Sequence, residues 1–61
     1  METYNVIGLS KENQDKIATR FRGAYISDRF SLTDVNVSVP DELADEFTDW
    51  CETYAKSHKL V

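Results

Sequence analysis

The segment from Val35 to Val39 constrains the fold of this chain more than any other. Val35, Val37 and Val39 alternate with Asn36 and Ser38. This period of two is typical of a strand with one buried face, because successive side chains of a strand point to opposite sides of the sheet. The segment therefore predicts a strand whose valines face the core.

Beyond Pro40 the spacing of the apolar residues becomes that of an amphipathic helix. We expect Ser38 to cap this helix, Asp41 to complete a capping box, and Pro40 to occupy the first turn, where its missing N–H costs nothing. The basic residues around His58 suit the C-terminal end of a helix dipole, so we expect the helix to reach this residue. The apolar stripe of the helix contains Leu43, Phe47, Trp50, Cys51 and Tyr54.

The first half of the chain predicts a strand followed by a helix. Residues 3–9 have the apolar content of a short strand. Ser10 is a suitable N-cap for a helix over about residues 11–22, since its hydroxyl can accept from an amide of the first turn. Ile17 and Phe21 lie one turn apart on this mostly polar helix, so we expect it to bury only a narrow stripe.

Residues 24–32 fit two interpretations. Ala24, Ile26, Phe30 and Leu32 alternate with polar residues, with an interruption near residue 28, and such a pattern suits a strand with a bulge. This strand would form a hairpin with the valine strand. Alternatively, the first helix continues through residue 27, and only one strand precedes the second helix. We favour the hairpin.

Together these elements predict a single small α+β domain spanning residues 1–61. The expected order is β-α-β-β-α, with a small two- to three-stranded sheet and two helices packed on one face. A chain of 61 residues buries a modest fraction of its surface on folding. Oligomerisation, as in a homodimer, or binding to a larger protein would add stability.

Acidic residues are concentrated in the second half of the chain. The formal net charge is −4, and seven acidic residues but no basic residue lie between positions 34 and 54. The segment 11–29 is mildly basic by contrast. This asymmetry predicts a bipolar molecule, and the acidic excess disfavours direct binding to nucleic acid, whose phosphates attract basic side chains.

The residues needed for catalysis or cofactor binding are scarce, so we expect neither an enzyme nor a cofactor. The only histidine, His58, is expected to be a surface residue at a helix end, and no phosphate-binding glycine loop is present. One cysteine and one histidine cannot form a structural zinc site, and no calcium-loop spacing occurs, so we expect no metal. Cys51 lies on the apolar stripe and is expected to be buried.

We expect a cytoplasmic protein without a membrane segment. An unpaired cysteine and the lack of a signal segment fit a reducing compartment. No apolar run approaches the length of about 20 residues that a membrane span requires.

The segment VNVSVPDELADEF resembles the strand and first helix of ribbon–helix–helix regulators. In that family the strands of a dimer pair, and their outward residues read the major groove of DNA. The resemblance implies a small dimeric DNA-binding regulator in which Asn36 and Ser38 hold the reading positions. It covers about 20 residues, and the chain departs from the family in lacking a second helix after the first and basic side chains on the strand.

The acidic helix predicts a different function, namely binding to a larger protein with a basic surface. Its carboxylates form two rows with a spacing of about one turn (~5–6 Å), which approaches the phosphate spacing of a nucleic acid. Such a helix could act as a nucleic-acid mimic that inhibits or modulates a nucleic-acid-binding protein, as small acidic viral and mobile-element proteins do. A merely solvated helix face is the alternative. Trp50 is either a core residue or an aromatic anchor for the partner. The predicted binding residues are Asp41, Glu42, Asp45, Glu46, Asp49, Glu52 and Trp50.

Overall fold

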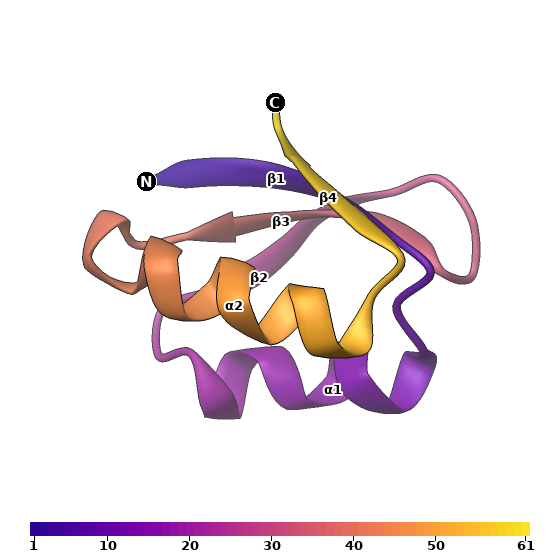
Figure 1. Ribbon diagram of the computed structural model, residues 1–61, viewed down its shortest axis with the longest axis horizontal. Coiled ribbons are helices and arrows are strands. Elements are labelled where there is room, and N and C mark those ends of the chain that lie inside the picture. Colours follow the sequence, from indigo (N-terminus) through magenta and orange to yellow (C-terminus); the bar gives the residue numbers. More distant parts are fainter.

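The valine segment is the inner strand β3 (Asp34–Val39) of a four-stranded antiparallel sheet in the computed structural model, which describes residues 1–61. Strand β1 (Glu2–Ile7) is the other inner strand. Strands β2 (Tyr25–Arg29) and β4 (Ser57–Leu60) form the edges, and the strand order is β2-β3-β1-β4. Figure 1 shows the sheet above the helices.

The alternation of side chains sets which face of the sheet is buried. Val6 lies opposite Val35, and Tyr4 lies opposite Val37. Residues that lie opposite each other on paired strands point to the same side of a sheet. All four of these side chains are buried, so they point to the side that forms the core. The predicted burial of the alternating valines is confirmed.

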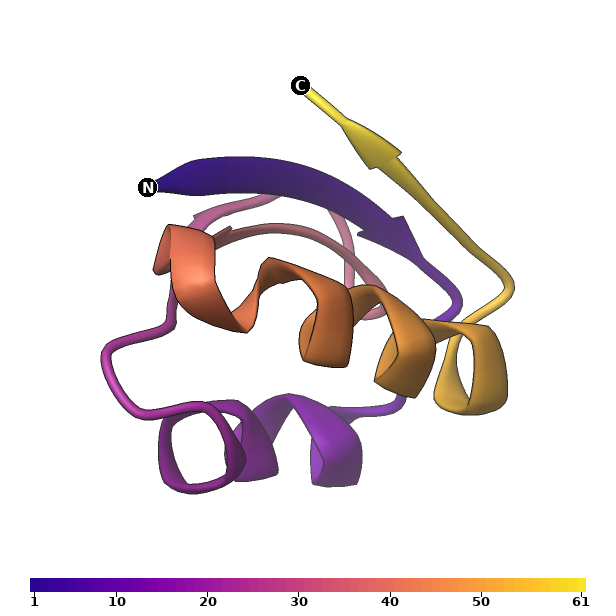
Figure 2. The ribbon, with the colours of Figure 1, turned by 60° about the vertical axis from the view of Figure 1, so that its left-hand side comes forward.

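Two helices cover this buried face, and both lie on the same side of the sheet (Figure 2). Helix α1 (Lys11–Arg20) begins at Ser10, whose hydroxyl accepts a hydrogen bond of 3.2 Å from the amide of Asn13. Helix α2 (Ala44–Tyr54) follows a short 3-10 turn, η1 (Asp41–Leu43). The rings of Phe21 and Phe47 meet edge to face between the helices, with centroids 5.3 Å apart. The predicted α+β class, the two helices on one face and the Ser10 cap are therefore confirmed.

The predicted order β-α-β-β-α was incomplete, because the chain continues into a fourth strand. Helix α2 ends at Tyr54, and Ala55 is already extended (φ −122°, ψ 161°). The amide of Lys56 then donates to the carbonyl of Ile7 at 2.8 Å, and β4 pairs with β1. His58, which we expected at a helix end, instead lies opposite Val6 in β4.

The added strand completes two interleaved units, β1-α1-β2 and β3-α2-β4. Strand β3 lies between β1 and β2, and β1 lies between β3 and β4. This is the split β-α-β arrangement. Helix α2 therefore connects the inner strand β3 to the edge strand β4 of the same sheet.

The hairpin interpretation of residues 24–32 is confirmed in outline. β2 pairs with β3, and the register shifts between Ile26 and Asp28, at the predicted interruption. The strand ends at Arg29, however. Phe30 and Leu32, which the alternation assigned to a half-buried strand, lie in the turn and are 59% and 74% exposed.

The expected capping box of the second helix was wrong. Ser38 remains in β3, where its hydroxyl shares a hydrogen bond of 2.9 Å with the hydroxyl of Thr3. Neither η1 nor α2 has a side-chain cap. The serine is engaged by the neighbouring strand, so it cannot reach the helix amides.

The face of the sheet away from the helices is polar. The amide nitrogen of Asn5 donates to side-chain oxygens of Asp34 and Asn36, at 2.9 and 3.0 Å. These bonds join β1 and β3 across the middle of the sheet. Neither helix of the structure is long and apolar enough to cross a membrane.

Candidate protein-binding surface

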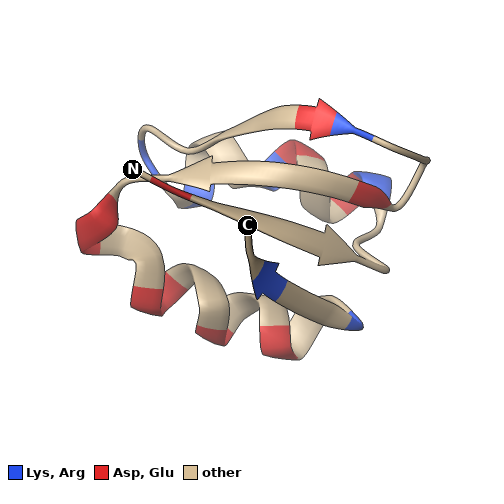
Figure 3. Cartoon of the chain, turned by 90° about the horizontal axis from the view of Figure 1, so that it is seen from above, with Lys and Arg blue, Asp and Glu red and all other residues tan.

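The predicted acidic residues form one exposed surface along η1 and α2. All six are exposed, whereas Ala44, Phe47 and Cys51 of the same segment are buried. Figure 3 shows the acidic positions along the helix. We call this set the acidic surface, and it consists of Asp41, Glu42, Asp45, Glu46, Asp49 and Glu52.

Helical geometry explains why these residues lie together. Successive residues of an α-helix are rotated by about 100°, so the four acids of α2 span an arc of about 120°. Asp45 and Glu52 lie toward one flank of this arc, and Glu46 and Asp49 lie toward the other. The buried stripe occupies the opposite side, so the helix separates its charged and apolar residues completely.

Five residues of the acidic surface have no basic partner within the chain. Asp41 forms an ion pair of 3.0 Å with the terminal amino group of Met1, and no ion pair involves the other five. Helix α1 contrasts with this pattern, because Lys11 pairs with Asp15 at 2.6 Å and Lys16 pairs with Glu12 at 3.6 Å. Helix α1 therefore pairs four of its five charged residues within the helix, whereas the acids of α2 are presented to solvent.

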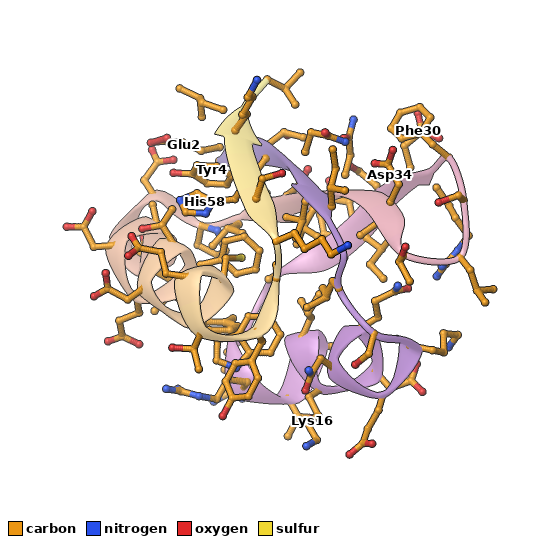
Figure 4. The ribbon with its side chains drawn as sticks, turned by 45° about the vertical axis from the view of Figure 1, so that its right-hand side comes forward. Glu2, Tyr4, Lys16, Phe30, Asp34 and His58 are labelled. Carbon is orange, nitrogen blue, oxygen red and sulfur yellow. The ribbon has the colours of Figure 1, made fainter.

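One flank of the acidic surface reaches the buried hydroxyl of Tyr4. This hydroxyl donates to a carboxylate oxygen of Glu2 at 3.0 Å. Burial raises the pKa of Tyr4, and the hydrogen bond to Glu2 together with the charges of Glu2, Asp45 and Asp41 raises it further. Figure 4 labels Glu2 and Tyr4 of β1 and His58 of the neighbouring strand β4. The sequence did not indicate this group, because β4 was not expected.

Trp50 borders the other flank of the acidic surface. It is partly buried, and its ring packs against the rings of Phe21 and Phe47, with centroid distances of 5.4 and 6.1 Å. The ring of Tyr54, which is 48% exposed, lies 5.3 Å away. Trp50 is thus a core contact that also keeps part of its surface exposed, and its role as an anchor for a partner stays a prediction.

A shallow groove of about 450 Å³ runs between the two helices at Trp50. Four of the five residues that line it come from α1, and the sequence did not indicate them as a group. The helices bring them beside Trp50 only because both pack on the same face of the sheet. The lining residues are Asp15, Lys16, Thr19, Arg20 and Trp50.

Cys51 is fully buried, as predicted. Burial raises the pKa of Cys51 to about 12, so the thiol remains protonated at neutral pH. A buried, protonated thiol is a poor nucleophile and a poor metal ligand.

The resemblance to ribbon–helix–helix regulators does not extend to the three-dimensional structure. Strand β3 pairs with β1 on one side and β2 on the other, so it has no free edge for a second copy. Asn36 accepts from the side chain of Asn5, and Ser38 is buried against Thr3. The two expected reading positions are therefore engaged within the sheet.

No family model matches this chain, and neither a curated protein nor a solved structure matches it significantly.

Proposed function

We propose that this protein binds the basic surface of a larger protein through its acidic surface, and thereby inhibits or modulates that protein. The observation that supports this function is the lack of basic partners for five exposed carboxylates on one side of α2. These charges are free to form ion pairs with another molecule. A basic partner would also relieve the repulsion among them.

Nucleic-acid-binding proteins are the best-matched class of partner. Their binding sites present lysine and arginine side chains spaced to meet phosphates. Asp49 lies about one helical turn, ~5–6 Å, from each of Asp45, Glu46 and Glu52 along α2, and this spacing is close to that of phosphates. The acidic surface would also steer association, because opposite charge accelerates the encounter of two proteins at low salt.

Asp45 and Glu46 lie in the first turn of α2, where the helix dipole favours acids, but Asp49 and Glu52 lie farther along and add like-charge repulsion. Asp45 and Asp49 are four residues apart, and Asp49 and Glu52 are three apart, spacings at which like charges repel. A purely structural helix gains more from the interleaved charges that α1 has. An unfavourable arrangement of charges is consistent with a binding role.

A pull-down from an extract of the native cell, read by mass spectrometry, tests the proposal. The immobilised bait carries Asp45→Lys and Asp49→Lys. The matched control carries Asp28→Lys, Leu32→Lys and Thr33→Lys, which change the net charge equally at exposed positions outside both the acidic surface and the groove at Trp50. We expect the first variant to lose the partner that the unmodified chain captures, and the control to retain it. Equal capture by all three baits would refute the proposal.

A gel shift with duplex DNA at low salt tests the competing function. A DNA-binding regulator would retard the DNA, and the retardation would fall steeply as salt is added. We expect no retardation, because the acidic surface repels the phosphate backbone.

A further inference from the structure

We infer that the groove at Trp50 receives an apolar side chain of the basic partner, flanked in the partner by lysine or arginine. This inference rests on the proposed function and specifies the chemistry of the partner segment. The groove volume of about 450 Å³ is open to solvent on the outer side of the helices. It therefore offers space for one or two side chains beside the acidic surface.

Contacts with the core fix the position of the Trp50 ring. Its ring contacts Phe21 and Phe47 in the core, at 5.4 and 6.1 Å between centroids, while its remaining surface lines the groove. A fixed aromatic ring loses little conformational entropy when a ligand covers it. Tryptophan, tyrosine and arginine are also enriched among the residues that dominate binding energy, and Trp50, Tyr54 and Arg20 occur here together.

The charges around the groove select the residues that flank the apolar side chain. On the α2 side, Glu46 precedes Trp50 by one turn and Asp49 is its neighbour, and neither has an ion-pair partner. Lysine or arginine on the occupant would meet these two carboxylates. Trp50 is the only residue of α2 that lines the groove, so these two carboxylates lie next to the groove on the same helix.

The α1 wall is closer to neutral. Lys16 pairs with Glu12, and Asp15 pairs with Lys11, so Arg20 is the remaining unpaired charge of that wall. Its guanidinium group lies over the ring of Phe21, 5.1 Å from the centroid. The N–H groups of this guanidinium are suited to backbone carbonyls of the occupant. An occupant with an apolar centre and basic flanks therefore fits both walls.

Two synthetic peptides provide the test. One has a leucine between two pairs of lysines, and the matched peptide has serine in place of leucine. The fluorescence of Trp50 reports binding directly, because it is the only tryptophan in the chain. We expect the leucine peptide to bind about tenfold more tightly, since partial burial of a leucine side chain is worth about that factor. This ratio should persist at high salt, where both affinities fall.

A pair of variants locates the effect. Thr19→Arg places a bulky cation in the groove, and Ala18→Arg places the same charge at an exposed position outside it. We expect Thr19→Arg to abolish the preference for leucine over serine and Ala18→Arg to retain it. Circular dichroism establishes that both variants are folded, as exposed helix positions should allow.

The outcomes separate this inference from the proposed function. If both peptides bind equally to the unmodified chain, and Asp45→Lys with Asp49→Lys abolishes that binding, the groove inference is wrong while the acidic surface remains a binding site. If neither peptide binds, both proposals fail. A preference for leucine that survives Thr19→Arg also contradicts the groove as its location.

Discussion

The side-chain oxygen of Gln14 accepts a hydrogen bond of 2.7 Å from the guanidinium group of Arg29. The amide nitrogen of the same glutamine donates to the backbone carbonyls of Leu9 and Leu32, at 2.9 and 2.7 Å. Gln14 is only 3% exposed. One buried side chain thus joins α1 to the end of β2, to the turn before β3 and to the segment that precedes α1.

Replacement of Gln14 by alanine should lower the free energy of unfolding by about 3 kcal/mol, because three hydrogen bonds are lost, one of them to a charged group. A domain of this size has a total stability of only about 3–9 kcal/mol. Urea denaturation measures the change. Asn13→Ala is the control, because the side chain of Asn13 forms no hydrogen bond, and it should cost less than about 0.5 kcal/mol. Similar losses for the two variants would mean that the Gln14 bonds contribute little.

Phe30 and Phe47 should respond in opposite ways to replacement by alanine. Phe47 is fully buried, whereas Phe30 is 59% exposed in the β2–β3 turn. We expect Phe47→Ala to cost about 3–5 kcal/mol, enough to unfold much of the protein, and Phe30→Ala to cost less than about 0.5 kcal/mol. Thermal melts followed by circular dichroism would distinguish the two, and a large loss for Phe30→Ala would contradict the exposed turn.

The buried thiol of Cys51 should make stability fall at alkaline pH. The pKa of Cys51 rises from 9.0 to about 12 on folding, so between these values the unfolded chain releases a proton that the folded chain retains. Below pH 9 the thiol therefore makes a constant contribution to the free energy of unfolding. Above pH 9 this contribution should fall by about 1.4 kcal/mol per pH unit.

Cys51→Ala provides the comparison for this pH dependence. Between pH 9 and 10 the variant should lack the slope that the thiol contributes, while the other titrating groups affect both proteins equally. Denaturant titrations at a series of pH values would reveal the difference. Parallel pH profiles for the two proteins would mean that the thiol is not shielded from water.

Removal of one acid from α2 should stabilise the protein. Asp49 lies four residues after Asp45, and three from both Glu46 and Glu52, so several like-charge pairs involve it. Each pair costs about 0.2–0.5 kcal/mol, and Asp49→Asn should raise the free energy of unfolding by about 0.5 kcal/mol at low salt. The gain should shrink at high salt, where the repulsion is screened.

Asp28→Asn is a suitable control for Asp49→Asn, because Asp28 is an exposed acid on β2 outside the acidic surface. It should give no comparable gain. Urea denaturation at low and high salt would measure both variants. A stability loss on Asp49→Asn would show that the acid supports the helix rather than straining it.

Local patterns predicted most of the fold, because each depended on residues close in sequence. The alternation of Val35, Val37 and Val39 reports a strand with one buried face, and Ser10 can cap only the helix that begins beside it. The apolar stripe of α2 likewise identified Phe47 and Cys51 as buried. The positions of the carboxylates on α2 follow from the same helical period.

Strand β4 could not be predicted in this way. Residues 57–60 show no apolar alternation. Their strand structure depends on pairing with β1, whose paired residues lie 50 to 56 positions earlier. His58 was wrongly predicted at a helix end for the same reason, because its place in β4 also depends on pairing with β1. Ser38 was misassigned as a cap because its hydroxyl finds a partner in Thr3, on a strand distant in sequence.

The sequence by itself determined which side of α2 is acidic and which is apolar, because helical rotation alone sorts those side chains. The tertiary structure decided what surrounds that helix. It left five carboxylates without an ion pair and set Trp50 beside four residues of α1 to form a groove. It also paired both edges of the valine strand with other strands of the sheet. These features depend on contacts between segments distant in the chain, which no local pattern encodes.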